Sequence, residues 1–257
     1  EPSVGVWLST VPMLQRRERA VASVVGGRLY VCGGFDGRQR LKSAERLSLE
    51  DGAWEALPPT LESRSQAAAA VISNKLYVCG GYDGVMILNT VESFDPQVSA
   101  WEPLAPILQR RSQAGAAVVM GILYLCGGYD GTERLNSVER YCPARGTWEL
   151  VAPAGERRSR AAAAAVGGRL YAFGGFDGAR RLNSAECFDP ASGAWVPVAP
   201  MRCPREGAAA AALWWPPTST LTPMPSGTPP PHVVPMAPFP PISSWHQEPR
   251  MAVAANT

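Results

Sequence analysis

Residues 75–84 are KLYVCGGYDG, an apolar segment that ends in two glycines and an Asp-Gly turn. Closely similar segments begin at residues 28, 122 and 169, so the pattern returns at a step of 47 residues. A fixed period of this length indicates an array of identical structural units. The glycine pairs that mark the period are Gly33 and Gly34, Gly80 and Gly81, Gly127 and Gly128, and Gly174 and Gly175.

Other residue types keep the same step along the chain. Tryptophans recur at Trp7, Trp54, Trp101, Trp148 and Trp195, arginines at Arg17, Arg64, Arg111, Arg158 and Arg205, and glutamates at Glu45, Glu92, Glu139 and Glu186. Because a residue repeated in every unit meets the same surroundings each time, we expect it to support the unit itself. We therefore assign structural roles to the glycine pairs and to Trp54, Trp101, Trp148 and Trp195.

Each unit contains four segments with the composition of short strands, separated by turn residues. In the second unit these segments are residues 66–72, 75–81, 90–95 and 100–104. The alanine run at residues 161–165 would favour a helix by intrinsic propensity, but it is short and a Gly-Gly turn follows it closely. Four antiparallel strands in each repeated unit predict the blades of a β-propeller, so the expected fold class is all-β.

Composition and charge exclude several classes of protein. The chain has 257 residues, 46% of them apolar and 18% charged, which is a globular balance. The 24 basic and 22 acidic residues give a net charge of +2, which provides no overall attraction to nucleic acid or to an anionic membrane. No apolar run approaches the roughly 18 residues needed to cross a bilayer. We expect neither nucleic acid nor membrane as a partner.

Catalytic residue types are scarce in the repeats. The chain has only two histidines, His232 and His246, and both lie in a proline-rich segment. Nucleophilic catalysis needs an oriented base, and most catalytic metal sites use histidine ligands. The repeated aspartates lie in Asp-Gly turns, where side-chain bonds to the backbone explain them. We therefore expect no enzyme, no catalytic residue, no metal site and no cofactor.

The cysteines indicate buried or free thiols. Cys32, Cys79 and Cys126 occupy one repeated position in an apolar strand, and Phe173 fills the same position in the fourth unit. Interchange with phenylalanine is typical of a buried, small apolar side chain. The six cysteines show no metal-binding spacing, and no secretory signal precedes the repeats. Free thiols indicate a reducing compartment, so we expect a cytoplasmic protein.

The glycine pair, the tyrosine three residues before it, the Asp-Gly turn after it, residues 136–139 (NSVE) and the spaced tryptophan together resemble the Kelch repeat. The resemblance covers residues 3–213, and within the Kelch repeat family the chain is most similar to Kelch-like proteins. It implies the last four blades of a six-bladed propeller. The implied parts are the last strand of an incomplete blade in residues 1–15, complete blades in residues 16–62, 63–109, 110–156 and 157–203, and a closing strand in residues 204–213.

Residues 214–257 follow a different pattern. They are rich in proline, carry only Glu248 and Arg250 as charged residues, and lose the 47-residue period. Such a segment favours disorder or extended polyproline II. Two interpretations stay open: a ligand for an SH3 or WW module, or a C-terminal segment without function.

Arginines gather in the connections between the last strand (D) of one blade and the first strand (A) of the next. The periodic arginines either pair with the periodic glutamates or bind a partner, and the pattern allows both. By resemblance to Kelch-like proteins, the D–A connections share one face with the B–C loops, which also contain Phe35, Arg38, Arg40 and Phe176. The candidate partner-binding residues are Arg16, Arg19, Arg64, Arg110, Arg111, Arg157, Arg158, Arg160, Tyr82, Met86, Tyr129, Arg134, Arg180 and Arg181.

These residues favour one kind of ligand. A guanidinium group binds carboxylate or phosphate in a bidentate fork, so we expect an acidic or phosphorylated peptide. The resemblance implies the substrate-recognition part of a BTB-Kelch adaptor of a cullin-RING ubiquitin ligase, whose cullin-binding domains lie outside these residues. The alternative is an actin-binding, cytoskeleton-associated scaffold. A propeller enzyme of the oxidase or sialidase type is the remote alternative.

Overall fold

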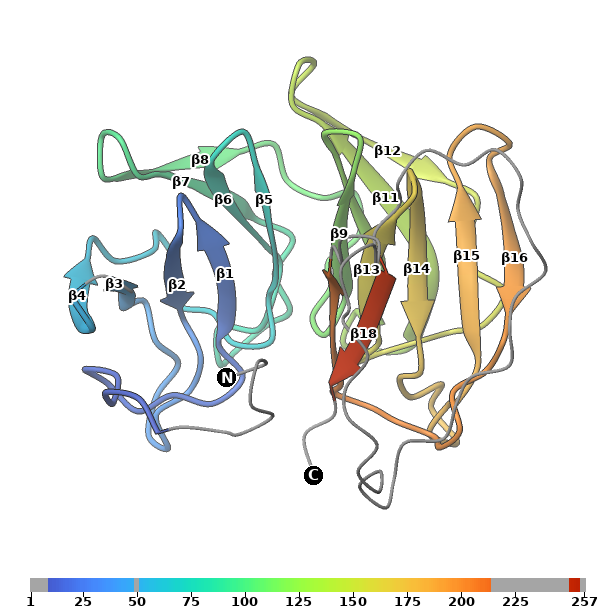
Figure 1. Ribbon diagram of the computed structural model, residues 1–257, viewed down its shortest axis with the longest axis horizontal. Coiled ribbons are helices and arrows are strands. Elements are labelled where there is room, and N and C mark those ends of the chain that lie inside the picture. The colour runs from blue at the N-terminus through green and yellow to red at the C-terminus, as the bar shows by residue number, and fades with distance from the viewer. Residues whose placement is uncertain (1–8, 49–50, 214–249, 255–257) are drawn as a thin grey trace, which may run out of the picture.

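A computed structural model describes residues 9–48, 51–213 and 250–254 as strands, turns and loops (Figure 1). Four four-stranded antiparallel sheets are followed by one two-stranded sheet. Within these residues no helix is long and apolar enough to cross a bilayer. The predicted all-β class is therefore confirmed, and each four-stranded sheet corresponds to one 47-residue unit.

We call the four sheets blades 1 to 4 and their strands A to D in chain order. Blade 1 comprises β1 (Val21–Val25), β2 (Arg28–Cys32), β3 (Ala44–Ser48) and β4 (Ala53–Leu57). Blade 2 comprises β5 (Ala68–Ile72), β6 (Lys75–Cys79), β7 (Val91–Asp95) and β8 (Ala100–Leu104). Blade 3 comprises β9 (Gly115–Val119), β10 (Ile122–Tyr129), β11 (Arg134–Cys142) and β12 (Thr147–Val151). Blade 4 comprises β13 (Ala162–Val166), β14 (Arg169–Phe173), β15 (Ala185–Asp189) and β16 (Ala194–Val198), and the last sheet pairs β17 (Ala209–Leu213) with β18 (Arg250–Ala254).

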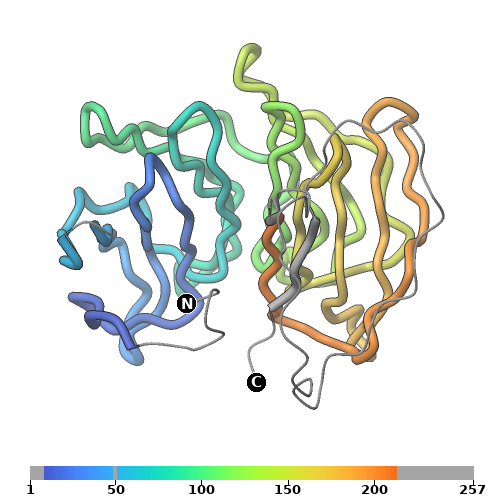
Figure 2. The backbone as a smooth tube through the Cα atoms, in the orientation of Figure 1, coloured from blue at the N-terminus to red at the C-terminus, as the bar shows by residue number. Residues whose placement is uncertain are grey.

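The alanine-rich A strands form the centre of the molecule. Each of β1, β5, β9 and β13 lies beside the A strand of the next unit, and β13 lies beside β17. Figure 2 follows this succession from blue to orange. A side chain at Gly115 would come within 2.9 Å of the Ala163 Cβ atom of the next blade. Small residues at these positions thus permit close packing, and the alanine run at residues 161–165 contributes to strand β13 (Ala162–Val166), not to a helix, as predicted.

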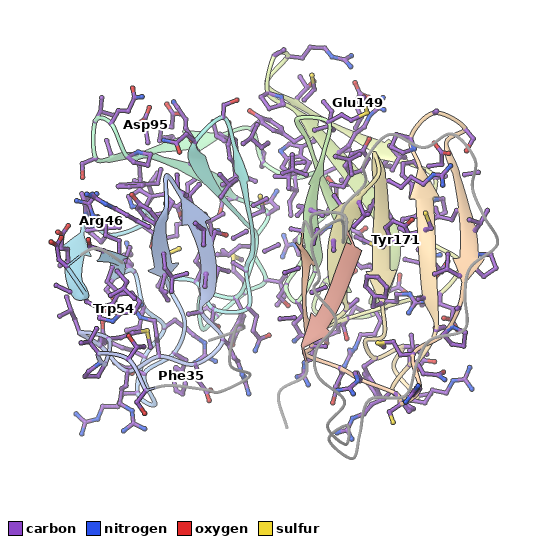
Figure 3. The ribbon with its side chains drawn as sticks, viewed as in Figure 1. Phe35, Arg46, Trp54, Asp95, Glu149 and Tyr171 are labelled. Carbon is purple, nitrogen blue, oxygen red and sulfur yellow. The ribbon has the colours of Figure 1, made fainter. Side chains whose placement is uncertain are left out.

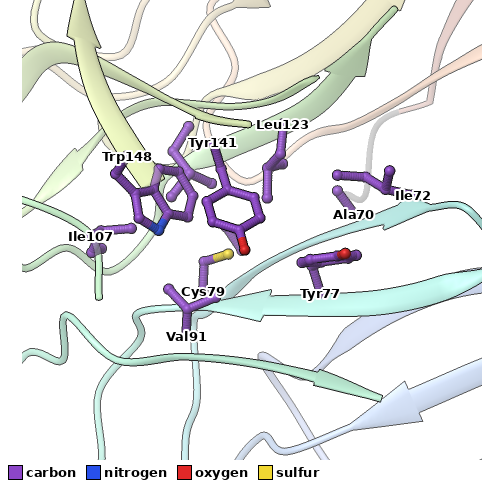
Figure 4. Packing of buried hydrophobic residues seen from close by; sticks show 11 residues of the cluster. Ala70, Ile72, Tyr77, Cys79, Val91, Ile107, Leu123, Tyr141 and Trp148 are labelled. Atoms are coloured by element: carbon purple, nitrogen blue, oxygen red, sulfur yellow. The ribbon is translucent and has the colours of Figure 1, made fainter. Parts of the chain in front are cut away.

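Aromatic side chains fill the outer part of each junction between blades. Between blades 2 and 3, the ring of Tyr141 lies 6.0 Å from that of Tyr77 and 5.1 Å from that of Trp148 (Figure 4). The Trp148 indole N–H donates to the Ala105 carbonyl at the end of blade 2, at 2.9 Å. The same bond is made by the other repeated tryptophans of the described residues, Trp54, Trp101 and Trp195. Each of these bonds joins two successive units, as a structural role requires.

A buried arginine holds each junction from both sides. The Arg111 backbone accepts from Gly81 N–H at 2.9 Å and donates to the Leu88 carbonyl at 3.0 Å, both in blade 2. Its guanidinium group lies in blade 3, where it donates to the Gly127 carbonyl at 2.7 Å and pairs with the Glu139 carboxylate. The equivalent ion pairs are Arg17–Glu45, Arg64–Glu92 and Arg158–Glu186.

Two predictions concern the ends of the chain. Residues 1–8 lie outside the described residues, and residues 9–15 form no strand, so the predicted D strand before blade 1 has no counterpart in the described part. In the segment predicted to be disordered, residues 250–254 form β18, which pairs antiparallel with β17. That prediction is therefore wrong for these five residues, and the rest of the segment lies outside the described residues.

The thiols of the B strands are buried as predicted. Cys32, Cys79 and Cys126 are at most 2% exposed, and burial raises the pKa of each thiol to about 12. All six cysteines are free. Because the thiolate is the reactive form, these three side chains behave as small apolar residues.

We expect the thiols to differ sharply in reactivity. Cys203 is exposed, and the side chain and backbone N–H of Arg145 lower the pKa of Cys142. With Ellman's reagent at about pH 8, these two should react fast in the native protein, and the three B-strand thiols only after denaturation. Mass spectrometry of the labelled peptides identifies the sites. Rapid native labelling of the B-strand thiols would contradict their burial.

A second prediction concerns the glycine that faces Arg111. Gly80 has φ 61°, and a Cβ atom there would overlap the Arg111 carbonyl oxygen, whereas a Cβ atom at Gly146 (φ 66°) meets nothing. Both alanine variants carry the same left-handed backbone cost of about 1–2 kcal/mol. We expect Gly80→Ala to lower the free energy of unfolding by about 2–3 kcal/mol more than Gly146→Ala, because it forces blades 2 and 3 apart. Equal urea midpoints for the two variants would refute this explanation.

Candidate partner-binding face

The D–A connections and the B–C loops lie at one end of the blades. Within blade 2, Ser65 and Tyr82 exchange backbone hydrogen bonds of 2.9 and 2.8 Å, which join the two segments. In Figure 3, Phe35 of a B–C loop lies at the lower edge of the molecule, and Asp95 lies at the opposite edge. We call this end the loop face. It comprises residues 16–20, 35–40, 63–67, 82–87, 110–114, 129–134, 157–161, 176–181 and 204–208.

The repeated aspartates shape the B–C loops, as predicted. In blade 4, an Asp177 carboxylate oxygen accepts from the backbone N–H groups of Ala179 and Arg180, both at 2.7 Å. These bonds, that of Arg180 first, lower the pKa of Asp177. Each loop is thereby held by a charged turn that directs the following side chains outward, and the Arg180 side chain is 75% exposed.

The structure corrects three of the predicted partner-binding residues. The side chains of Arg64, Arg111 and Arg158 are only 2%, 1% and 0% exposed. Each lies in a blade junction, where its guanidinium group donates to backbone carbonyls and pairs with a periodic glutamate. The prediction that these arginines bind a partner is therefore wrong, and the alternative, pairing with the periodic glutamates, is confirmed.

Three other arginines of the D–A connections, each directly before a periodic arginine, reach the surface. Arg16 and Arg110 are exposed. Arg157 is exposed as well and pairs with Glu133 of the neighbouring B–C loop. Each of these three directly precedes a buried periodic arginine. Within each pair of neighbours, the periodic arginine is buried and the other faces outward. The three exposed side chains are available to a ligand, although none of them lines either of the two cavities described below.

Two arginines of the B–C loops are stacked between aromatic rings of adjacent blades. The Arg134 guanidinium carbon lies 4.2 Å from the Tyr129 ring centroid and 5.4 Å from that of Phe176. Arg40 is placed in the same way, 4.1 Å from Phe35 and 5.2 Å from Tyr82. Such cation–π contacts restrict the guanidinium before any ligand arrives. Arg40, which the sequence analysis placed in a B–C loop of the candidate face, stands at the repeat position of Arg134.

One open cavity of about 770 Å³ brings four predicted residues together. Its walls contain Arg134, Arg160, Arg180 and Arg181 around the ring of Phe176, and Glu206 closes one side. Four guanidinium groups around one aromatic surface make a site suited to an anionic group next to an apolar one. Glu206 was not a predicted site residue, because its repeat position holds serine in blades 2 to 4.

A second cavity, of about 450 Å³, lies where the A strands begin. Arg19, Gln66, Gln113 and Arg160 form its polar rim. Each of these four has positive φ, and each N–H group from Gln66 onward donates to the carbonyl of the equivalent residue one blade earlier, at 2.8–2.9 Å. The glutamines were missed by the sequence analysis, although they share a repeat position with Arg19 and Arg160.

The other predicted residues have separate positions on the loop face. Tyr82 and Tyr129 serve as ring partners of the stacked arginines, and the hydroxyl of each donates within its own loop at 2.6 Å. Met86, 49% exposed, and the neighbouring Val85, 88% exposed, form an apolar loop tip in blade 2. The loop face therefore offers clustered arginines at blade 4 and an apolar tip at blade 2.

Comparison with known proteins agrees with this architecture. A solved structure titled "Structure of YjhT" is similar over 76% of this chain and 74% of that chain, with a TM-score of 0.69 and 15% sequence identity. At this identity the likeness concerns the fold alone. The Kelch motif matches residues 16–60, 63–107, 110–155 and 157–202, which are the four blades. The chain therefore belongs to the Kelch repeat family.

Proposed function

We propose that this Kelch propeller captures an acidic or phosphorylated protein segment on its loop face. Kelch propellers generally bind proteins. The observation that carries the more specific proposal is the convergence of Arg134, Arg160, Arg180 and Arg181 in one open cavity beside Phe176. The ligand's carboxylate or phosphate group would lie among the guanidinium groups, and an adjacent apolar residue would cover the ring.

The arginine side chains of the cavity differ in conformational freedom, and this difference suits capture of a flexible segment. Arg134 is held by two rings, so it loses little conformational entropy when it binds an anion. Arg180 is 75% exposed and can follow the ligand. The apolar tip formed by Val85 and Met86 provides a second contact for an aliphatic side chain of the same ligand. Charge complementarity orients the ligand and raises its association rate, and burial of apolar surface adds affinity.

The wider role that we propose rests on the resemblance to Kelch-like proteins. By likeness to Kelch-like proteins, the propeller is the substrate-recognition part of a BTB-Kelch adaptor of a cullin-RING ubiquitin ligase in the cytoplasm. In this proposal the chain itself performs no catalysis. In this proposal the four blades form part of a six-bladed ring, and β17 would be the strand that closes it. Its position beside the A strand of blade 4 is compatible with that role.

Charge reversal in the cavity tests the proposal. A labelled hexaglutamate peptide serves as the acidic probe, and fluorescence anisotropy at low salt measures its binding to the 257-residue chain. We expect Arg134→Glu combined with Arg180→Glu to weaken binding by at least about tenfold, because two charge-assisted contacts become repulsive.

The matched control reverses two exposed arginines away from the loop face. Arg145→Glu combined with Arg169→Glu changes the net charge by the same amount and also disrupts surface ion pairs. This control should change probe affinity less than about twofold. Equal losses in both double variants would mean that only net charge matters, and the proposed site would be abandoned. Thermal melts establish that each variant is folded.

A further inference from the structure

Glu206 is the acidic residue in the wall of the arginine cavity. Its carboxylate accepts from Arg181 Nε at 3.0 Å and from an Arg160 terminal nitrogen at 3.4 Å. The Glu206 side chain is 21% exposed, less than either arginine. One carboxylate of the protein thus lies between two of the four guanidinium groups that form the proposed site.

The repeat offers an internal comparison for this contact. In blades 2 to 4 the equivalent residue is a buried serine, whose hydroxyl donates to a carbonyl of its own B–C loop, as Ser159 does to Phe176 at 3.2 Å. In the first unit it is Glu18, which is 59% exposed and lies 3.6 Å from its neighbour Arg19. A glutamate at this position is therefore not drawn in by the backbone alone. Arg160 and Arg181 hold Glu206 in the cavity.

We propose that Glu206 acts as a built-in competitor that determines which ligands the cavity accepts. In the free protein its carboxylate occupies the place of a ligand's anionic group at Arg160 and Arg181. Arg134 and Arg180 stay available, so a segment with one anionic group binds there alone. A segment with two or more adjacent acidic groups displaces Glu206 and gains both remaining arginines. This inference rests on the proposed function and adds to it a residue that determines specificity.

The strength of the contact suits this role. Ion pairs between partly exposed side chains contribute little, so a ligand carboxylate can replace the Glu206 carboxylate at small cost. Replacement conserves the hydrogen bonds of Arg160 and Arg181 and needs no backbone movement. The expected effect of Glu206 is therefore a moderate reduction in affinity for acidic segments, not a complete block.

Removal of the Glu206 charge tests the inference. In the 257-residue chain, Glu206→Gln should tighten hexaglutamate binding by about three- to tenfold at low salt, as measured by fluorescence anisotropy. The matched control is Glu133→Gln. Glu133 is also on the loop face and pairs with an exposed arginine, but it does not line the cavity. This control removes the same charge and should tighten binding by less than about twofold.

A second variant identifies the arginine through which Glu206 acts. In an Arg181→Gln background, Glu206→Gln should lose at least half of its effect, because the group that it sets free is missing. Unchanged tightening in that background, equal tightening by Glu133→Gln, or no tightening at all would each overturn the inference. Thermal melts verify folding, and Glu206→Ala serves as the second variant if Glu206→Gln alters the melt.

Failure of the proposed function has a different signature. In that case the wild-type chain and Glu133→Gln bind hexaglutamate no better than the Arg134→Glu, Arg180→Glu double variant. If Glu206→Gln still gains binding, the competitor role stands and the native chain has another ligand. If no variant binds, both proposals are refuted.

Discussion

The ion pair between a buried arginine and a buried glutamate is the interaction on which the blades depend. Burying either charge alone would be very costly, and pairing offsets this cost only with good geometry and further hydrogen bonds. Arg111 meets both conditions, since it pairs with Glu139 and donates to the Gly127 carbonyl. Because its backbone is bonded to the previous blade, the same residue fixes the position of two sheets. The positions of the loops on either side of Arg111 therefore depend on the same contacts.

Much of the fold was predictable because the period places equivalent residues in equivalent surroundings. The strand Ala162–Val166 was predictable because its alanine run is short and a Gly-Gly turn follows it, and the interior cysteines followed from comparison of one unit with the next. The exposure of individual arginines was harder to predict. Arg157 and Arg158 are neighbours of one type in one connection, and only the junction between blades determines which of them is buried.

The site depends on departures from the repeat, which a period cannot reveal. Glu206 meets arginines that are 25 and 46 residues away, across a boundary between units. Ile87 interrupts the series of stacked arginines formed by Arg40 and Arg134. Such differences leave the backbone unchanged and alter only the chemistry of the loop face. The periodic residues thus hold the scaffold, and the irregular ones distinguish one blade from another.

The ladder of backbone bonds around the second cavity has a direction. At each ladder position, namely Gln66, Gln113, Arg160 and Gly207, the backbone N–H group donates to the unit before it. Each unit therefore presents a donor to one neighbour and an acceptor to the other. Contacts of this head-to-tail kind specify a neighbour but not the number of neighbours. Deletion or duplication of a whole unit would leave each junction chemically complete. Growth of such a protein by gene duplication therefore requires no new interface, and the angle between units limits how many can follow one another.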